Sequence, residues 1–294
     1  MKKRKIDLFP YFLTLPAIVL FTVFIILPFF DGLYMSFFRW DGFSEPVFIG
    51  LRNYKNAFSD SLFWLSMKHT FIYAILVTVI KNIVAFILAY ILVSKVPCQS
   101  LFRTGIYLPV TLSYVVIGVL WSWIYNPTFG LLNAFLKVIG KEEWILGWLS
   151  DPDIALYSVV MVDVWKWVGY HMVLYLAGLQ AISKDFYEAA SIDGANSFQK
   201  LIHVTIPQLN STIVVNVLMS ITGAFASNYD IVNVMTGGGP ANSTEVSLTY
   251  IVSTAFKHTN MGKANAMSMI LFAFVFVFGF FQLKIMSRED GYEA

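Results

Sequence analysis

The sequence predicts an all-α membrane protein: one domain, residues 1–294, in which six transmembrane helices form a bundle. Two observations support this. Of the 294 residues, 57% are hydrophobic and 13% are charged, whereas about a quarter of the residues of an ordinary soluble domain are charged. Six apolar runs also reach the length of about 20 residues that a helix needs to cross a bilayer. These runs cover residues 11–38, 71–93, 106–125, 154–179, 212–235 and 266–285.

The first apolar run follows a basic cluster of Lys2, Lys3, Arg4 and Lys5. The run is too long for the apolar part of a signal peptide and lacks a small-residue cleavage site, so we expect it to be retained as a membrane anchor. Basic residues beside a span favour the cytoplasmic side. Because six spans return the chain to the side on which it starts, we expect both termini in the cytoplasm.

Composition and motifs exclude several classes of function. A net charge of +2, spread along the chain, gives no basic surface for nucleic acid. The single cysteine, Cys98, rules out an intrachain disulfide and a clustered cysteine metal site. No G-x-x-x-x-G-K-[ST] phosphate loop occurs, and the glycines at 237–239 lack the Lys and Ser/Thr that would follow. We therefore expect no catalytic residue, no metal and no cofactor bound by this chain.

Helix-breaking residues interrupt several spans. A lipid-exposed helix would break or bend at Pro16, Pro28 and Pro109 unless neighbouring helices or water satisfy the freed backbone groups. The same holds for Gly118 and Gly169. Non-ideal helices of this kind suit a bundle that lines a cavity. Alternatively, Pro16 and Pro28 only shape the ends of the first span.

The fourth span carries ionisable side chains at membrane depth, where charge is costly and a functional role is the first expectation. Positions i, i+3, i+4, i+7 and i+8 share one face of a helix, and we expect this face to look into the bundle. A carboxylate and an ammonium group bind hydroxyls, and aromatic rings stack on the apolar face of a sugar ring. The face therefore predicts a sugar site, and it holds Asp163, Lys166, Trp167, Tyr170 and His171.

A structural interpretation of the same face stays open. Asp163 and Lys166 lie one turn apart and would then neutralise each other, while Trp165 and Trp167 would anchor or pack the helix. Lys81, in the second span, either reaches the membrane surface or pairs with an acid, and it receives no role.

The fifth span holds a second polar series. We expect three of its members, Asn228, Tyr229 and Asp230, to add to the substrate site, with Asp230 nearer the outer end. Alternatively, the polar side chains of this span join helices to one another. This alternative applies to the entire series, which also includes Asn216 and Ser220.

The segment 182–210, between the fourth and fifth spans, is polar and rich in small residues. Asp185, with Glu188 three residues later, predicts a helix start, and Gly194 predicts its end, since glycine adopts the left-handed conformation without penalty. Asn196 or Ser197 would then cap a second short helix. This second helix includes Phe198 and Leu201 and must stop before Pro207.

Small side chains leave the first of these helices with little bulk. Ala189, Ala190, Ser191 and Ala195 would let the backbone of another protein approach closely. The segment therefore predicts a docking element for a soluble partner. A well-capped surface loop is the alternative, in which Glu188 only caps and Asp193 only interacts with solvent at the helix end.

The spacing of this segment resembles the "EAA" motif of permease subunits in binding-protein-dependent ABC importers. The match comprises Glu188-Ala189-Ala190, Gly194 and the run Val204-Thr205-Ile206-Pro207, in which Val204 and Ile206 replace Ile and Leu. Two more stretches resemble the carbohydrate branch of that family, which includes maltose-type and glycerol-phosphate-type permeases. They are Leu-Ala-Gly-Leu-Gln at 176–180 and Thr-Gly-Gly-Gly-Pro at 236–240. A third stretch, Ile-Gly-Leu-Arg-Asn-Tyr at 49–54, is similar to a segment that recurs in the family after the first span.

The resemblance implies a multi-pass subunit of the cell membrane that forms half of the pathway for a sugar, either an oligosaccharide or a related polyol phosphate. It implies three kinds of protein partner besides lipid and sugar: a second homologous permease, two ATP-binding subunits that use ATP and Mg²⁺, and an extracytoplasmic solute-binding protein. The helix around Glu188 would insert into a cleft of the ATPase, with Gly194 as its hinge. The implied coupling residues are Glu188, Ala189, Ala190, Asp193, Gly194, Phe198 and Pro207.

Two other classes of function compete. A secondary transporter driven by an ion gradient would also suit the charged face of the fourth span, but the docking motif disfavours it. A membrane enzyme would use Asp163 and His171 as acid and base, but no nucleophile or metal-ligand spacing supports it.

Overall fold

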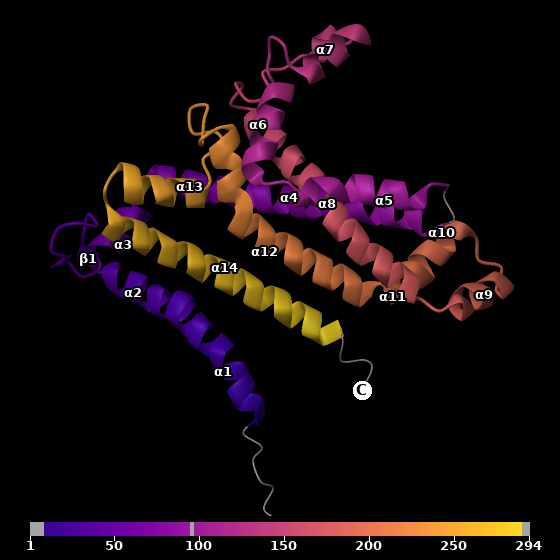
Figure 1. The fold of residues 1–294 in the computed structure, drawn as a ribbon, viewed down its shortest axis with the longest axis horizontal. Coiled ribbons are helices and arrows are strands. Elements are labelled where there is room, and N and C mark those ends of the chain that lie inside the picture. The colour runs from indigo at the N-terminus through magenta and orange to yellow at the C-terminus, as the bar shows by residue number, and fades with distance from the viewer. Residues whose placement is uncertain (1–8, 95–96, 290–294) are drawn as a thin grey trace, which may run out of the picture. The chain divides into compact units, whose positions relative to one another are not determined.

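A computed structural model describes residues 9–94 and 97–289 of the chain, and most of these residues are helical (Figure 1). The all-α class is confirmed. The basic cluster of Lys2, Lys3, Arg4 and Lys5, on which the predicted orientation rests, lies outside the described residues. Contacts divide the chain into two compact units, residues 1–63 with 251–274 and residues 64–250 with 275–294.

The first unit contains the N-terminal span and the beginning of the last helix. Asn53 joins segments of this unit, because its Nδ2 donates to the carbonyls of Ser36 at 2.9 Å and Phe38 at 2.7 Å. Lys263 Nζ lies 2.6 Å from Asp60 Oδ2. The elements of this unit are α1 (Phe9–Phe21), the π-turn η1 (Thr22–Ile26), α2 (Leu27–Met35), the antiparallel strands β1 (Phe38–Arg39) and β2 (Val47–Phe48), α3 (Arg52–Phe58), η5 (Ser253–Lys257) and the first part of α14 (Met261–Glu289).

The second unit contains the candidate site and the 182–210 segment. Helix α4 (Ser61–Val93) runs almost entirely within it, and α13 (Ser247–Val252) begins in it. The other elements are α5 (Gln99–Tyr107), η2 (Leu108–Thr111), α6 (Tyr114–Ile124), α7 (Leu131–Val138), η3 (Glu142–Trp144), α8 (Ala155–Ala181), α9 (Lys184–Ile192), α10 (Ser197–Lys200), η4 (Leu201–Thr205), α11 (Ile206–Gln208) and α12 (Asn210–Met235).

Among the described residues, four helices are long and apolar enough to cross a membrane, or five if one bent pair counts as a span. The predicted count of six is therefore not reached on length and composition. Helix α8 has the length, 27 residues, but it carries Asp163 and Lys166 and is largely covered by neighbouring helices. A helix enclosed by protein does not need the continuous apolar surface that lipid demands.

The predicted third span, 106–125, is not one straight helix. Residues Gln99–Thr111 and Tyr114–Ile124 meet at 103°. Pro109 lies at this break, as expected, and Ser113 starts the next helix because its Oγ accepts from the N–H of Val116. Pro16, by contrast, lies inside α1 without ending it.

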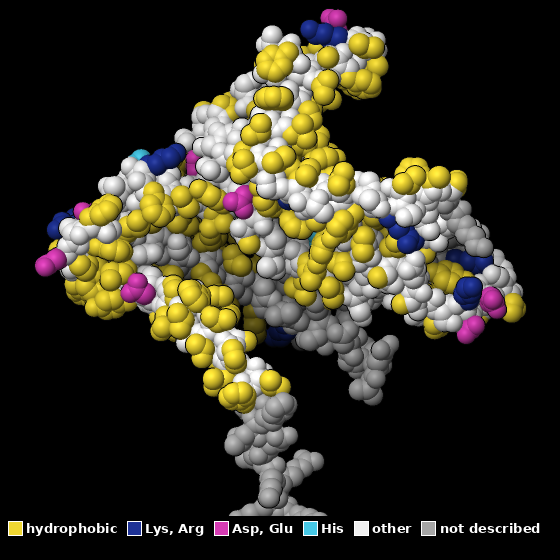
Figure 2. All heavy atoms as spheres, viewed as in Figure 1, with side chains coloured by type: hydrophobic (Ala, Val, Ile, Leu, Met, Phe, Trp, Pro, Cys, Tyr) yellow, Lys and Arg dark blue, Asp and Glu magenta, His cyan; other side chains and the backbone are white. Residues whose placement is uncertain are grey.

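The core of the second unit forms where α4, α6, α8 and α12 meet. Tyr73, Ile117, Val162 and Ile231, one from each of these helices, are fully buried and belong to one cluster. Glycine allows a further close approach: a Cβ on Gly169 of α8 would lie 2.3 Å from the carbonyl oxygen of Ile106. Apolar side chains cover α1 and α2, whereas charged side chains gather over α9 and α10 (Figures 1 and 2).

The 182–210 segment forms the two short helices that the sequence predicts, with one change at the start. Ser183, rather than Asp185, caps α9, because its Oγ accepts from the N–H of Asp185. The extended backbone of Ile182 ends α8, and Ser183 as the cap of α9 places Asp185 inside the first turn. Gly194 ends α9 as predicted, with φ +79°, and the N–H groups of Gly194 and Ala195 close back onto the helix.

The second short helix begins as expected and ends differently. Asn196 caps α10, and Gln199 reaches back to complete a capping box. The expectation that helix must stop before Pro207 is wrong. A π-turn, in which the N–H of Ile206 donates to the carbonyl of Leu201, leads into α11, and Pro207 stands in its first turn, where the missing N–H costs little.

Candidate functional site

Helix α8 carries three ionisable side chains into the interior of the second unit. Asp163, Lys166 and His171 are each no more than 3% exposed. A buried charge must be paired or hydrogen-bonded, because moving it out of water costs several kcal/mol. Each of the three groups has such partners, and the partners come from other helices.

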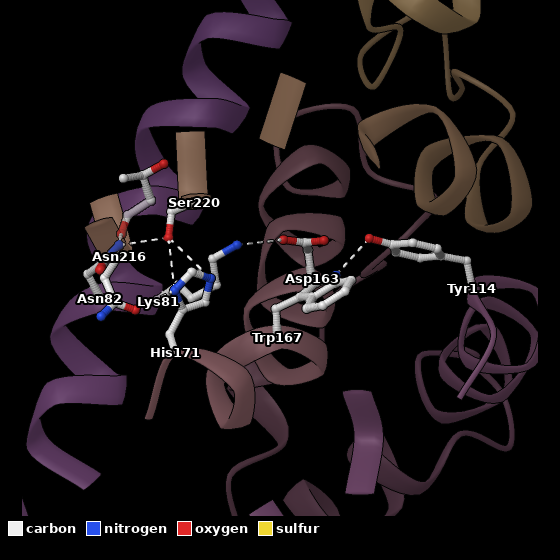
Figure 3. Close-up of polar contacts among 9 residues, drawn as sticks. Lys81, Asn82, Tyr114, Asp163, Trp167, His171, Asn216 and Ser220 are labelled. Atoms are coloured by element: carbon white, nitrogen blue, oxygen red, sulfur yellow. Dashed lines mark hydrogen bonds and ion pairs between the residues drawn. The ribbon is translucent and has the colours of Figure 1, made fainter. Parts of the chain in front are cut away.

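Asp163 pairs with Lys81 of α4, whose Nζ lies 3.7 Å from Asp163 Oδ2 (Figure 3). The side chains of both residues are 4% exposed. The sequence offered Lys166, one turn along the same helix, as the neutralising partner, and the structure corrects this point because Lys166 points elsewhere. For Lys81 the sequence left two alternatives open, and the structure supports the one in which it pairs with an acid, because its long side chain crosses from the neighbouring helix.

Lys166 holds the break in the third span. Its Nζ donates to the carbonyls of Leu112 at 2.5 Å, Val110 at 3.3 Å and Pro109 at 3.4 Å. It also lies 4.9 Å from the ring centre of Tyr114 and 5.1 Å from that of Trp167. An ammonium group has three donors and is favourable at the carbonyl end of a helix. Lys166 thus gives additional hydrogen bonds to backbone carbonyls at the bend.

A cavity of about 370 Å³ lies between α4, α6, α8 and α12. Of the eight predicted substrate residues, it brings together Asp163, Trp167, Tyr170 and His171. Lys166 is not among the residues that line it. The lining also includes six residues that the sequence analysis did not select: Lys81, Tyr114, Met219, Thr222, Gly223 and Ser227.

The fifth span contributes a different face from the predicted one. Asn228, Tyr229 and Asp230 are not among the lining residues; Asn228 is fully buried and Asp230 is exposed. The face that lines the cavity instead follows the spacing i, i+3, i+4 and i+8 from Met219. That spacing was a usable signal in the sequence, but its residues are small or apolar, whereas the prediction rested on the larger polar side chains of the same span.

Aromatic rings form one wall of the cavity. Trp167 Nε1 donates to the hydroxyl of Tyr114 at 2.7 Å (Figure 3). The rings of Trp167 and Tyr170 meet edge to face, with centroids 6.0 Å apart. These contacts fix the ring orientations before any ligand arrives. The wall therefore offers flat apolar faces beside hydroxyl groups, the combination that a sugar ring fits.

A buried hydrogen-bond network joins the helices below this wall. His171 Nδ1 lies 2.8 Å from Asn216 Oδ1, and Asn82 Nδ2 donates to Ser220 Oγ at 2.9 Å (Figure 3). The hydroxyl of Tyr175 donates to Asn82 Oδ1 at 2.8 Å. The network connects α4, α8 and α12, so Asn216 and Ser220 follow the structural alternative, in which polar groups hold helices together.

The predicted coupling residues lie on or beside α9. Glu188, Ala189, Asp193, Gly194, Phe198 and Pro207 are exposed, and Ala190 is half-buried. Two large apolar side chains stand out: Ile192 is 87% exposed and Phe198 is 68% exposed. Beside them, a hollow of about 360 Å³ includes Ala190 and Gly194 in its lining. The segment thus offers small residues and uncovered apolar groups to a partner.

Two side-chain contacts tie α9 to the turn that leads into α12. Lys200 Nζ donates to Ser191 Oγ at 2.7 Å. The hydroxyls of Tyr187 and Thr205 lie 3.1 Å apart, and Thr205 is 1% exposed. The exposed helix is therefore joined to a buried part of the second unit rather than hanging from flexible chain.

Comparison with known proteins gives a consistent family. The family described as binding-protein-dependent transport system inner membrane component matches residues 81–288. A probable ABC transporter permease protein of Bacillus subtilis, YurN, is 37% identical and covers 94% of each chain. The trehalose/maltose transport system permease protein MalF of Thermococcus litoralis is 33% identical over 94% of this chain and 92% of its own.

Solved structures share the fold. The structure of a bacterial ABC transporter involved in the import of the acidic polysaccharide alginate contains a chain that superposes with a TM-score of 0.83, covering 96% of both chains at 23% identity. The likeness extends over nearly the entire chain.

Proposed function

Because the chain belongs to the family of binding-protein-dependent transport system inner membrane components, we propose that it is one transmembrane subunit of an ATP-driven importer of a sugar or a related polyol phosphate. Its helices form half of the translocation pathway. The proposal rests chiefly on the cavity that α8 and α12 line, where Trp167 and Tyr170 provide aromatic faces and Asp163 and Lys81 provide paired charges.

The substrate site in this proposal consists of the cavity residues. Aromatic faces contact the apolar side of a sugar ring, while the Tyr114, Thr222 and Ser227 hydroxyls exchange hydrogen bonds with those of the ligand. Lys166 supports the site by holding the bent third span, as its contacts with backbone carbonyls suggest. Asn228, Tyr229 and Asp230 remain candidates for contacts formed in another conformation of the transporter.

The energy comes from partner subunits. Two ATP-binding subunits, using ATP and Mg²⁺, dock on the 182–210 segment of this chain and on that of a second, homologous permease. This chain itself binds no cofactor. An extracytoplasmic solute-binding protein delivers the sugar, and no nucleic acid takes part. The proposed orientation places both termini and α9 in the cytoplasm.

Coupling follows the connections of α9. When ATP closes the two ATPase subunits, α9 moves with the subunit on which it docks. Tyr187 and Lys200 pass this motion to the turn before α12, and α12 lines the cavity with Met219 and Gly223. ATP binding thereby shifts the population between inward-facing and outward-facing states.

Transport by the complete importer tests the proposal. The permease pair, the ATPase and the binding protein are reconstituted in proteoliposomes, and uptake of labelled sugar is measured. We expect uptake to require ATP and to continue after ionophores collapse all ion gradients. Uptake that continues without ATP but stops with the ion gradient would favour a secondary transporter and overturn the proposal.

A further inference from the structure

The opposite charges of two side chains that line the cavity cancel each other. Lys81 and Asp163 both line it, and their charged ends lie 3.7 Å apart. Whether the shared proton sits on the amine or on the carboxylate, the pair contributes no net charge. The side chains of both residues are 4% exposed, so bulk water does little to screen the pair.

The third nearby charge is turned away from the cavity. Lys166 Nζ faces the carbonyls of Leu112, Val110 and Pro109 and the rings of Tyr114 and Trp167. Its three donors therefore have three acceptors, and the carbonyl dipoles at the end of η2 compensate its positive charge. Lys166 is absent from the cavity lining, so it has no free donor to offer a ligand.

The rest of the lining is suited to an uncharged ligand. It consists of aromatic rings, hydroxyl groups, Met219, Gly223 and His171, whose Nδ1 is engaged with Asn216. A phosphate or carboxylate that entered would lose its water and gain no unpaired cation, which is costly. A neutral sugar carries hydroxyls and an apolar ring face, and it would find partners for both.

We propose that this cavity takes an uncharged carbohydrate and rejects sugar phosphates and uronic acids, with the Lys81–Asp163 pair as its charge-selective element. The inference rests on the proposed function and narrows the substrate class that this function leaves open. The pair excludes anions because Asp163 occupies the ammonium group of Lys81, the lysine among the described residues that line the cavity.

Binding to the complete permease–ATPase complex, without the solute-binding protein, tests this selectivity directly. The complex is placed in lipid nanodiscs, and calorimetry compares neutral probes (glucose, galactose, maltose, maltotriose) with anionic probes (glucose 6-phosphate, glucuronic acid, sn-glycerol 3-phosphate). We expect the best neutral probe to bind at least about tenfold more tightly than any anionic probe, a ratio that corresponds to about 1.4 kcal/mol.

Two variants assign the selectivity to the pair. Asp163→Asn leaves Lys81 unpaired, and we expect it to shift the preference toward the anionic probes by about tenfold, since close buried charges couple at this level or above. The double variant Lys81→Gln/Asp163→Asn removes both charges and avoids an unpaired buried ion, so it should retain the neutral preference even if the single variant fails to assemble.

The possible results of these binding experiments distinguish a failure of the proposed selectivity from a failure of the proposed function. An anionic probe that binds wild type as tightly as the best neutral probe, or a double variant that prefers anions, overturns the inference and leaves the importer assignment standing. Binding of no probe at all to wild type overturns the site itself, and with it both the proposed substrate cavity and its selectivity.

Discussion

The hydroxyl of Tyr187 lies 3.1 Å from Thr205 Oγ1, and this contact links the exposed helix α9 to a buried residue of the turn that leads into α12. Thr205 also donates to the carbonyl of Lys200 at 3.3 Å. Because α12 lines the cavity through Met219 and Gly223, a displacement of α9 reaches the proposed substrate site through this contact and along α12.

Tyr187→Phe tests this route. The substitution keeps the ring and removes the hydroxyl, so the free energy of unfolding should fall by only about 0.5–1.5 kcal/mol, the usual contribution of a hydrogen bond. We expect the ATPase to co-purify normally while sugar transported per ATP hydrolysed falls severalfold. Thr205→Val should have the same effect, and the double variant should add nothing. Unchanged coupling in all three variants would remove this contact from the mechanism.

Gly194→Pro should release the ATPase from detergent-solubilised complexes. Gly194 has φ +79°, and its N–H donates to the carbonyl of Ser191, whereas proline fixes φ near −65° and has no N–H. The matched control is Gly140→Pro, because Gly140 ends α7 with φ +70° and the same kind of hydrogen bond. The control should retain the ATPase. Equal retention in both variants would contradict docking through α9.

Gly223→Phe should block the substrate cavity. A Cβ on Gly223 meets no atom within 4 Å, and the residue lines the cavity, so a benzyl group enters open space where the sugar would sit. We expect sugar binding to be lost while assembly and basal ATP hydrolysis persist. Gly105→Phe, at an exposed α5 position with the same open space, is the matched control. A Gly223→Phe variant with wild-type sugar affinity would place the substrate elsewhere.

Trp167→Ala should weaken sugar binding by about tenfold, since an aromatic contact of this kind contributes about 0.5–1.5 kcal/mol beyond the area it buries. The variant also removes the N–H that donates to the hydroxyl of Tyr114, and it removes the indole ring that lies beside the ammonium group of Lys166. Trp123→Ala, which removes a 68% exposed ring from α6, should change nothing in the same titration. Equal sugar affinities in the two variants would argue against stacking on Trp167.

The sequence was most informative where structure depends on neighbouring residues. The apolar runs predict α4, α12 and α14 because a helix that contacts lipid must be apolar along its length. Gly194 and Asn196 predict the corner of the 182–210 segment, because helix ends depend on the backbone and caps of a few residues. The spacing around Glu188 indicated the family, which the family comparison confirms.

Contacts between distant segments were not predictable from local pattern. Asp163 has an acceptable partner one turn away in Lys166, and only the packing of α4 against α8 brings Lys81 closer. The sharp bend at Pro109 presents the carbonyls of Pro109 and Leu112 to Lys166, and the sequence predicted a span without this bend. For α12, polarity favoured Asn228, while the geometry of the bundle turned Met219 and Gly223 toward the cavity.

Placement of α9 on the ATPase in the cytoplasm is the central claim, and cysteine cross-linking measures it most directly. Cys98 is the only cysteine, so Cys98→Ser provides a cysteine-free background. One of two single cysteines is then introduced into it. Ile192→Cys lies at an 87% exposed position of α9, and Phe43→Cys lies at a 91% exposed position in the β1–β2 loop. We predict that Ile192→Cys cross-links to the ATP-binding subunit and that ATP changes the yield of this cross-link. We also predict that a membrane-impermeant maleimide, added outside intact cells, labels Phe43→Cys but not Ile192→Cys. Labelling of Ile192→Cys from outside, with no cross-link to the ATPase, would contradict the account.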